Sequence, residues 1–265
     1  MSKLIYDLGM HDGADTAFYL HKGYRVLAIE ANPTLCERAR TKFADAIADG
    51  RLTILDLAVS DTDGEATFYI NLDDDHWSSL DPAWGTRNDT RYKTTAVQTR
   101  PLCWLIEQYG VPHYLKIDIE GADLTVLRQL QAVPVKPTFL STEEHEIEYF
   151  PLLWSLGYRG FKIVNQGQIH HLDYDGWHFE PGSSGPFGDE IPGPWLPFGE
   201  AMLEYMLNVR DCRERELFTF GWWYDIHATL SQPALPADHP YPVRRISTRS
   251  RLRSAASRIK KALTR

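Results

Sequence analysis

The chain has 265 residues, of which 43% are hydrophobic and 24% charged, a composition typical of an ordinary globular domain. Nine basic and no acidic residues fall between 244 and 265, so the remainder carries a net charge of −17 rather than the overall −8, which argues against nucleic acid as a partner. No apolar stretch reaches the roughly 18 residues of a membrane span. No secretory leader precedes the first predicted strand, and Cys36, Cys103 and Cys212 lack the spacing of metal ligands or of a disulfide framework. We therefore expect a cytoplasmic protein.

The N-terminus predicts a βαβ unit. In chain order its parts are a strand over Leu4–Leu8, a turn with Gly9 and Gly13, a helix over 14–20 and a strand over 24–29. Glu30 stands at the tip of the second strand, roughly 20 residues after the turn, where nucleoside-binding units place the acid that binds a ribose hydroxyl. The unit therefore predicts a nucleoside site.

The turn itself disfavours a dinucleotide. A dinucleotide fingerprint would have glycines where this chain has His11 and Ala14. Asp7 at the mouth of the turn would repel a pyrophosphate, whereas it suits a ligand that carries an ammonium and a sulfonium, such as S-adenosylmethionine.

Helices and strands continue to alternate up to residue 172. Helices are predicted over 33–48, 102–109, 122–131 and 150–156, and strands over 51–57, 65–70, 94–98, 114–119, 138–142 and 158–164. Residues 71–93 are predicted to be a polar loop, whose three consecutive aspartates are better explained by solvation than by a cation site. Residues 168–172 are predicted to return through a hairpin at Gln166–Gly167. The fold class is therefore a Rossmann-like, doubly wound, mostly parallel α/β sheet with a terminal antiparallel strand.

Charged residues gather at the ends of two of these strands. Lys116, Asp118 and Glu120 interrupt the apolar strand around residues 114–119, and Glu143, Glu144 and His145 follow the next strand. Carboxyl ends of parallel strands share one edge, where open α/β sheets bind ligands. Glu143 and Glu144 would point to opposite faces, so at most one of them joins a site.

The last third of the chain differs in composition. Residues 173–243 are rich in tryptophan and phenylalanine and are predicted to be loops plus one helix over 199–207, whose aromatic side chains either fill the core or form a substrate wall at the ligand edge. We therefore divide the chain into a nucleoside-binding domain over 1–172, a capping extension over 173–243 and a basic tail over 244–265. Leu252, Ala256, Ile259 and Leu263 give the tail an amphipathic pattern, which predicts either binding to an anionic membrane surface or a plain basic tail.

Five motifs, taken in order, resemble the FkbM-type methyltransferases over residues 3–165. They are residues 7–16, 29–33, 57–64, 77–80 and 115–123. The resemblance implies an S-adenosylmethionine-dependent O-methyltransferase that acts on sugar or polyketide hydroxyls. It assigns Asp7, Gly9 and Gly13 to the methionine part of the cofactor, Glu30 to the ribose, Ala58 to the adenine wall and Ser79 to the carboxylate end. We also predict that Asp118 contacts the cofactor, near the transferring methyl. The family more often has Ala-Asn in place of Met10–His11, so the resemblance implies no contact for His11.

Methyl transfer to a hydroxyl requires alignment of donor and acceptor and removal of the hydroxyl proton. We predict Asp118 and His145 as the catalytic residues. The alternative is a divalent cation such as Mg²⁺, for which Asp118, Glu143, Glu144 and His145 are candidate ligands.

The predicted acceptor is a hydroxyl of a sugar, glycan or glycolipid, and a polyketide or another small molecule is the alternative. Two other classes are weighed: a nicotinamide-dependent oxidoreductase, and a non-catalytic module at the membrane surface. The sequence does not predict an oligomeric state.

Overall fold

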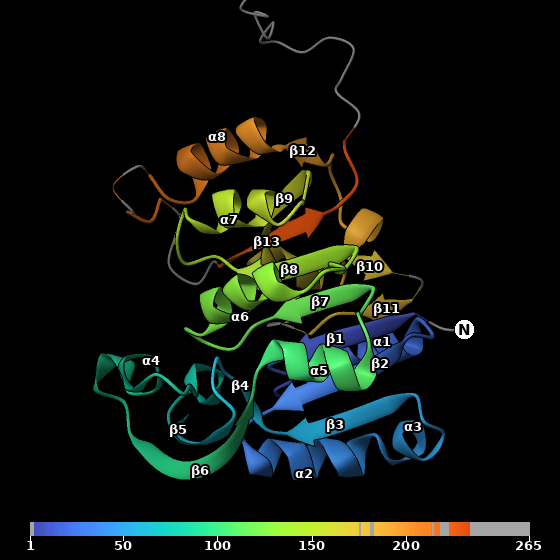
Figure 1. The fold of residues 1–265 in the computed structure, drawn as a ribbon, viewed down its shortest axis with the longest axis vertical. Coiled ribbons are helices and arrows are strands. Elements are labelled where there is room, and N and C mark those ends of the chain that lie inside the picture. The colour runs from blue at the N-terminus through green and yellow to red at the C-terminus, as the bar shows by residue number, and fades with distance from the viewer. Residues whose placement is uncertain are drawn as a thin grey trace, which may run out of the picture. The chain divides into compact units, whose positions relative to one another are not determined.

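The computed structural model describes residues 3–174, 176–180, 183–211, 213, 215–217 and 223–233, which belong to one compact unit ending at Pro233 (Figure 1). Within it, an eight-stranded sheet has the order β12-β9-β13-β8-β7-β1-β2-β3. The strands are β1 (Leu4–Leu8), β2 (Arg25–Glu30), β3 (Leu52–Asp56), β7 (Tyr114–Ile117), β8 (Phe139–Glu143), β9 (Gly160–Asn165), β12 (Leu196–Pro197) and β13 (Tyr224–Thr229). The predicted basic tail lies outside the described residues.

Five neighbouring strands, β3, β2, β1, β7 and β8, run parallel, so their carboxyl ends meet at one edge. Strand β13 runs the other way between β8 and β9, as the opposed arrows of β7 and β13 in Figure 1 show. The predicted Rossmann-like, mostly parallel sheet with an antiparallel strand is confirmed. The edge formed by β1, β2, β7 and β8 is the place where ligands bind in such sheets.

The antiparallel strand was expected in the wrong place. Residues Gln166–His171 form a 3-10 helix, η4, rather than the return of a hairpin, and the antiparallel strand is β13, more than 50 residues later. The physical reason lies in the pairing of β9, which is hydrogen-bonded to β13 on one side and to β12 on the other. β13 occupies one edge of β9 over its whole length, Gly160–Asn165, so residues 168–172 cannot pair on that side.

Two sets of helices cover the two faces of the sheet. On one face lie α1 (Ala14–His21), α2 (Pro33–Lys42) and α3 (Ala44–Ala48), and on the other lie α5 (Leu102–Tyr109), α6 (Asp123–Gln129), α7 (Tyr149–Ser155) and α8 (Phe198–Asn208). The single helix expected over 33–48 is two helices that meet at Phe43, whose φ of −111° departs from helical geometry. The Asn32 side chain caps the first of them by accepting a hydrogen bond from the Thr34 backbone N–H.

Aromatic residues after position 173 fill the core on the α1 face. Phe187 stacks on Tyr114 at a centroid distance of 4.0 Å, and Phe179 packs against Phe18 at 4.9 Å. This segment includes β10 (Asp173–Tyr174), β11 (Trp177–His178) and the 3-10 helix η5 (Gly188–Glu190). Of the two interpretations of these aromatic residues, core filling holds for Phe179 and Phe187.

A second sheet joins the main one at its ligand edge. It has the strand order β4-β6-β5, with β4 (Ala58–Val59), β5 (Gly64–Asn71) and β6 (Tyr92–Arg100). Residues 72–91, here called the insertion loop, connect β5 to β6 and contain η1 (Asp75–Trp77), α4 (Pro82–Gly85) and η2 (Arg87–Asp89), as Figure 1 shows. The predicted structureless loop is thus a string of short helical turns. A further 3-10 helix, η3 (Leu130–Ala132), continues α6.

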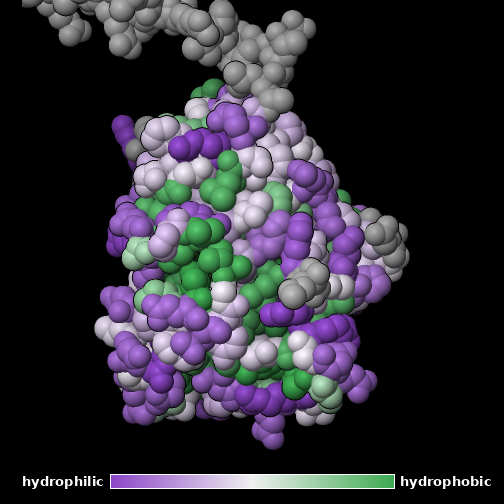
Figure 2. Space-filling view, turned by 45° about the vertical axis from the view of Figure 1, so that its right-hand side comes forward, coloured by the Kyte–Doolittle hydropathy of each residue, from purple (hydrophilic) through white to green (hydrophobic). Residues whose placement is uncertain are grey.

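The surface mixes polar and apolar residues. Figure 2 shows apolar residues as separate patches among hydrophilic ones on the face in view. Among the described residues, no helix has the length and apolar character needed to cross a membrane.

Candidate functional site

The turn after β1 is pressed against the end of β7. Gly9 has φ +82°, and a Cβ atom there would lie 1.8 Å from the carbonyl oxygen of Asp118. Gly13 has φ +77°, and a Cβ atom there would lie 2.5 Å from the ring of Phe43. Only glycine fits both demands. The two glycines therefore let the turn close over β7 and over α2.

Glu30 fastens this turn to the end of β2. Its carboxylate accepts hydrogen bonds from the backbone N–H of His11 at 2.9 Å and of Asn32 at 2.7 Å. Burial raises the pKa of Glu30, although these backbone hydrogen bonds oppose the rise. The side chain also lines the cavity described next, so this carboxylate can hold a polar group of a ligand.

A cavity opens at the ends of β1, β2 and β7. Its empty space of about 700 Å³ includes space that is open to solvent. Its apolar lining includes Ile29, Leu35, Ala58, Val59, Phe68 and Leu80, and its polar lining includes Glu30, His76, Asp118 and Glu120. An apolar wall with a few polar groups suits a nucleoside.

Beneath the turn lies a buried charge network. The Lys116 ammonium is 3.0 Å from Asp118, 3.3 Å from Asp15 and 3.6 Å from Asp7. Asp7 also accepts a hydrogen bond from the Thr16 hydroxyl at 2.6 Å, and burial raises the pKa of Asp7 to about 6. Through its hydrogen bond from Lys116, this network fixes the position of the Asp118 carboxylate.

Three carboxylates meet where β7 and β8 end. Oxygens of Asp118, Glu120 and Glu143, here called the acidic cluster, lie within 4.8 Å of one another. Burial and the nearby Glu143 raise the pKa of Glu120 to about 9, so this group holds a proton at neutral pH. Burial opposes the charge of His145, but Glu143 at 3.5 Å and Asp123 outweigh it and raise the pKa of His145 to about 9. His145 is therefore an imidazolium at neutral pH.

The insertion loop supplies a wall beside the acidic cluster. The Arg87 guanidinium lies over the ring of Trp77 at 4.4 Å and that of Trp84 at 4.7 Å, and it pairs with Glu120 at 3.1 Å. Trp84 also contacts the ring of His145, with the centroids 4.7 Å apart. Flat aromatic faces thus stand next to groups that can move a proton.

The predicted site residues fall into two sets. Gly9, Glu30, Ala58 and Asp118 line the cavity. The others lie outside its lining: Asp7 is buried beneath the turn, Gly13 packs on Phe43, Ser79 donates a hydrogen bond to the Glu120 carbonyl at 2.6 Å, and His145 lies behind Glu143.

Glu144, a predicted metal ligand, is turned away from the acidic cluster. Its carboxylate accepts hydrogen bonds from the Tyr205 hydroxyl at 2.6 Å and the Arg210 Nε at 2.7 Å. Glu143 joins the cluster instead, as the alternation of side chains along a strand requires for two adjacent residues. Of the two adjacent candidates, Glu143 therefore lies in the acidic cluster and Glu144 does not.

Sequence reasoning assigned no role to Trp84, Arg87, Asp75 or His76, and it left out His11. The available signal was the presence of two tryptophans and an arginine inside a polar stretch. Exposed loops rarely contain such residues without a contact to make.

Most of the chain matches the model of one known family. This model, described as "Methyltransferase FkbM domain", matches residues 7–209. A protein of Methanospirillum hungatei JF-1 named "Probable ribosomal RNA small subunit methyltransferase A" is 40% identical over 53 residues, which are 20% of this chain and 21% of that protein. The chain thus matches about a fifth of that curated relative.

Solved structures resemble the chain only distantly. A precorrin-6y C5,15-methyltransferase from Geobacter metallireducens GS-15 is 11% identical with a TM-score of 0.40, over 87% of this chain and 81% of that one. A 1,6-didemethyltoxoflavin-N1-methyltransferase from Burkholderia thailandensis is 12% identical with a TM-score of 0.35, over 87% of this chain and 72% of that one.

Proposed function

This chain belongs to the FkbM methyltransferase domain family, whose model covers more than half of it, and from this membership we propose that it is an S-adenosylmethionine-dependent O-methyltransferase. The proposed acceptor is a hydroxyl of a sugar, glycan or glycolipid. The observation that carries the proposal is the position of Asp118, which lines the cavity and also belongs to the acidic cluster. A donor in the cavity and an acceptor at the cluster would meet at this residue.

The residues of the cavity fit the cofactor. Glu30 presents a buried carboxylate at the end of β2, where a ribose hydroxyl can donate to it. Ala58, Val59 and Phe68 offer an apolar surface for an adenine ring. The close approach of Gly9 to Asp118 leaves the turn backbone exposed to the methionine part. Asp7 would act on that part indirectly, by holding the turn and Lys116.

When bound, the cofactor supplies a methyl group on a positively charged sulfur. Transfer of this methyl group would form a bond from the acceptor oxygen to carbon and break the carbon–sulfur bond, whose electron pair would stay on sulfur. Asp118 takes the hydroxyl proton, since its carboxylate faces the cavity and is fixed by Lys116. The chain contributes alignment and one proton acceptor.

His145 is proposed as a positioning residue rather than as the base. With a pKa near 9 it is already protonated at neutral pH and has no lone pair for the hydroxyl proton. Its charge instead stabilises the carboxylate of Glu143, and its ring supports Trp84.

The route through a divalent cation is the alternative mechanism. The acidic cluster offers three oxygen ligands, the kind that Mg²⁺ prefers. Glu120 holds a proton at neutral pH and the Arg87 guanidinium lies 3.1 Å from it, so the acidic cluster carries less negative charge than three ionised carboxylates would, which favours the metal-free route. Abolition of methyl transfer by EDTA with recovery on Mg²⁺ addition would reverse this preference.

The wall of the insertion loop supports a carbohydrate acceptor. Arg87 covers one face of Trp77 and of Trp84, so only the remaining exposed parts of these half-buried rings would contact the apolar face of a sugar, and Arg87 and the acidic cluster would hydrogen-bond its hydroxyls. A polyketide hydroxyl is the second candidate, because an apolar chain could use the same aromatic surface.

Calorimetry with S-adenosylhomocysteine and NAD⁺ tests the cofactor. We expect the purified chain to bind the first and not the second, and the reverse result would replace the methyltransferase by an oxidoreductase. Formation of S-adenosylhomocysteine from S-adenosylmethionine with a panel of methyl glycosides, glycolipids and polyketide alcohols tests the acceptor. Turnover of the polyketide alcohols alone would overturn the carbohydrate assignment.

A further inference from the structure

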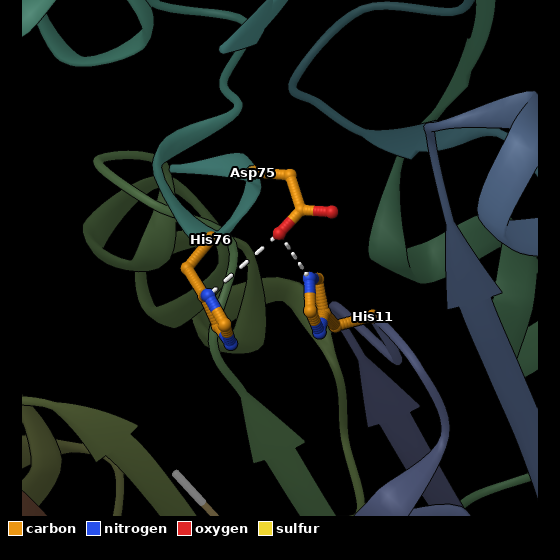
Figure 3. Close-up of side chains that lie close together, drawn as sticks. All are labelled: His11, Asp75 and His76. Carbon is orange, nitrogen blue, oxygen red and sulfur yellow. Dashed lines mark hydrogen bonds and ion pairs between the residues drawn. The ribbon is translucent and has the colours of Figure 1, made fainter. Parts of the chain in front are cut away.

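Three potential metal ligands meet at the cavity from elements that are distant in sequence. His11 belongs to the turn after β1, whereas Asp75 and His76 belong to η1 of the insertion loop. Figure 3 shows one nitrogen of each imidazole facing the same oxygen of Asp75. All three residues line the cavity. We call this group the histidine cluster.

The distances in the histidine cluster are near those of a metal site. Asp75 Oδ1 lies 3.0 Å from His11 Nε2 and 3.8 Å from His76 Nδ1, and the three ligand atoms lie within 4.8 Å of one another. Bonds of about 2.1 Å in a tetrahedron place ligand atoms about 3.4 Å apart. Small side-chain movements would therefore bring all three atoms onto one ion.

The donor set indicates which ions would bind. Two imidazoles and one carboxylate suit Zn²⁺ and similar transition metals, whereas Mg²⁺ and Ca²⁺ prefer oxygen ligands. The histidine cluster differs in this respect from the acidic cluster, which offers only oxygens. The two groups would therefore select different cations.

The local charge also favours a cation. Asp74 Oδ1 lies 3.2 Å from His76 Nδ1, next to Asp75. In the described part of the chain, the ion pairs of Asp74 and Asp75 are to histidines and none is to a lysine or an arginine. A cation would thus enter a site whose negative charge is not neutralised by a permanent positive charge.

The histidine cluster is joined to the groups that would hold the cofactor. His11 adopts the left-handed φ of +52°, which is uncommon for a residue other than glycine, and its backbone N–H is bound by Glu30. Its ring stacks on that of His76 at 4.0 Å with an angle of 28°. An ion here would link the turn to the insertion loop beside Glu30.

We propose that His11, Asp75 and His76 form a site for a divalent transition-metal ion, with Zn²⁺ as the probe, that fastens the insertion loop over the mouth of the cavity. Three protein ligands leave one position for water in a tetrahedral site. The proposal concerns metal binding by the chain itself and stands apart from the methyl-transfer reaction.

The test is titration of the full chain, freed of metal and of any histidine tag, with Zn²⁺ in a calorimeter and with Co²⁺ in an absorption spectrometer. We expect one ion to bind per chain. Bound Co²⁺ should show the visible absorption bands of a four-coordinate, tetrahedral ion. His11→Asn and His76→Asn should each weaken Zn²⁺ binding on the order of 100-fold or more, because loss of even an outer-sphere partner costs 10–100-fold. Asparagine suits the left-handed backbone at position 11.

His170 and His171 provide the matched control. Their rings lie 3.8 Å apart in η4, outside the cavity lining, so a variant with both changed to Asn should bind Zn²⁺ as the wild type does. Loss of binding in this control, no binding by the wild type, or equal binding by wild type and His76→Asn would each overturn the proposal. So would displacement of Zn²⁺ by equimolar Mg²⁺. Circular dichroism checks that each variant is folded. If His11→Asn does not fold, the result for His76→Asn decides, because the His76 side chain is exposed and its replacement should not disturb the fold.

Discussion

Alanine at Gly9 provides a direct test of how the site is built, with Gly23→Ala as its matched control. The two glycines have nearly equal φ values, +82° and +80°, so the strain of placing an L-residue in the left-handed region is the same. That strain costs roughly 1–2 kcal/mol. A Cβ atom at Gly23 would meet nothing within 4 Å, whereas one at Gly9 would lie 1.8 Å from the carbonyl oxygen of Asp118.

The overlap at Gly9 forces a movement of more than an ångström, because a real contact of this kind is not shorter than 3.0 Å. Overpacking of this kind typically adds about 1–3 kcal/mol, so we expect Gly9→Ala to lower the free energy of unfolding by about 2–5 kcal/mol and Gly23→Ala by about 1–2 kcal/mol. Urea unfolding gives these values. Calorimetry should show weaker binding of S-adenosylhomocysteine in the first variant only. Equal stability and equal affinity of the two variants would refute the packing argument.

The remaining predictions concern charge and the tail. Glu30→Ala should weaken S-adenosylhomocysteine binding by about 1.5–3 kcal/mol, the value of hydrogen bonds to a charged group, and an unchanged dissociation constant in a folded variant removes Glu30 from the site. Asp118→Asn should lower turnover on the order of 10²-fold or more with little change in cofactor affinity. His145→Ala should also lower turnover, and it should shift the pH profile of the rate because it removes the positive charge beside Glu143. Equal losses in rate and in cofactor affinity would count against the proposed role of either residue. The pKa of Glu120 is raised from 4.5 to about 9, so the folded chain keeps a proton that the unfolded chain releases, and this contribution to stability is present below pH 4.5 and lost as the pH rises through 9. The free energy of unfolding of Glu120→Gln, measured with urea, should therefore decline less steeply between pH 4.5 and 9 than that of the wild type. Identical slopes of the two would contradict the raised pKa of Glu120. Sedimentation with anionic vesicles should require the tail and fade with salt, and equal sedimentation of the full chain and a version ending at Val243 would exclude the tail as an anchor.

Local patterns were enough to predict that Gly9, Glu30 and Asp118 lie at the same edge of the sheet, where they line the cavity. Gly9 follows β1 directly and Glu30 ends β2, so the short βαβ unit dictates both positions. Asp118 was predictable for the same reason, because a carboxylate at the end of a buried strand is costly unless it has a charged partner or a ligand to bind. Their mutual contacts, such as the bond from the His11 backbone to Glu30, follow from closure of the same turn.

Strand β13 was missed, although its residues alternate apolar and polar as a strand with one solvent-exposed face would. The pattern does not show that its polar residues Asp225 and His227 are buried, which places the strand inside the sheet. Their burial depends on pairing with β8 and β9, for example of His227 with Ser141 and Lys162, which lie 65 or more residues earlier. The nearby turn at Gln166 therefore gave the stronger local signal, although it was the wrong one.

The acceptor half of the site depends on contacts between the insertion loop and the segment after β7. Ser79 donates to the Glu120 carbonyl, Arg87 pairs with the Glu120 carboxylate, and Trp84 covers Gly121 so closely that a Cβ atom there would lie 2.4 Å from its ring. None of these contacts is local, and a polar loop by itself predicts only solvation. Gly9 lies in the turn after β1 and Glu30 ends β2, whereas Trp84 and Arg87 lie on the insertion loop, so the proposed donor half and the proposed acceptor half stand on separate elements. Asp118 lines the cavity and belongs to the acidic cluster, which is why we propose it as the proton acceptor.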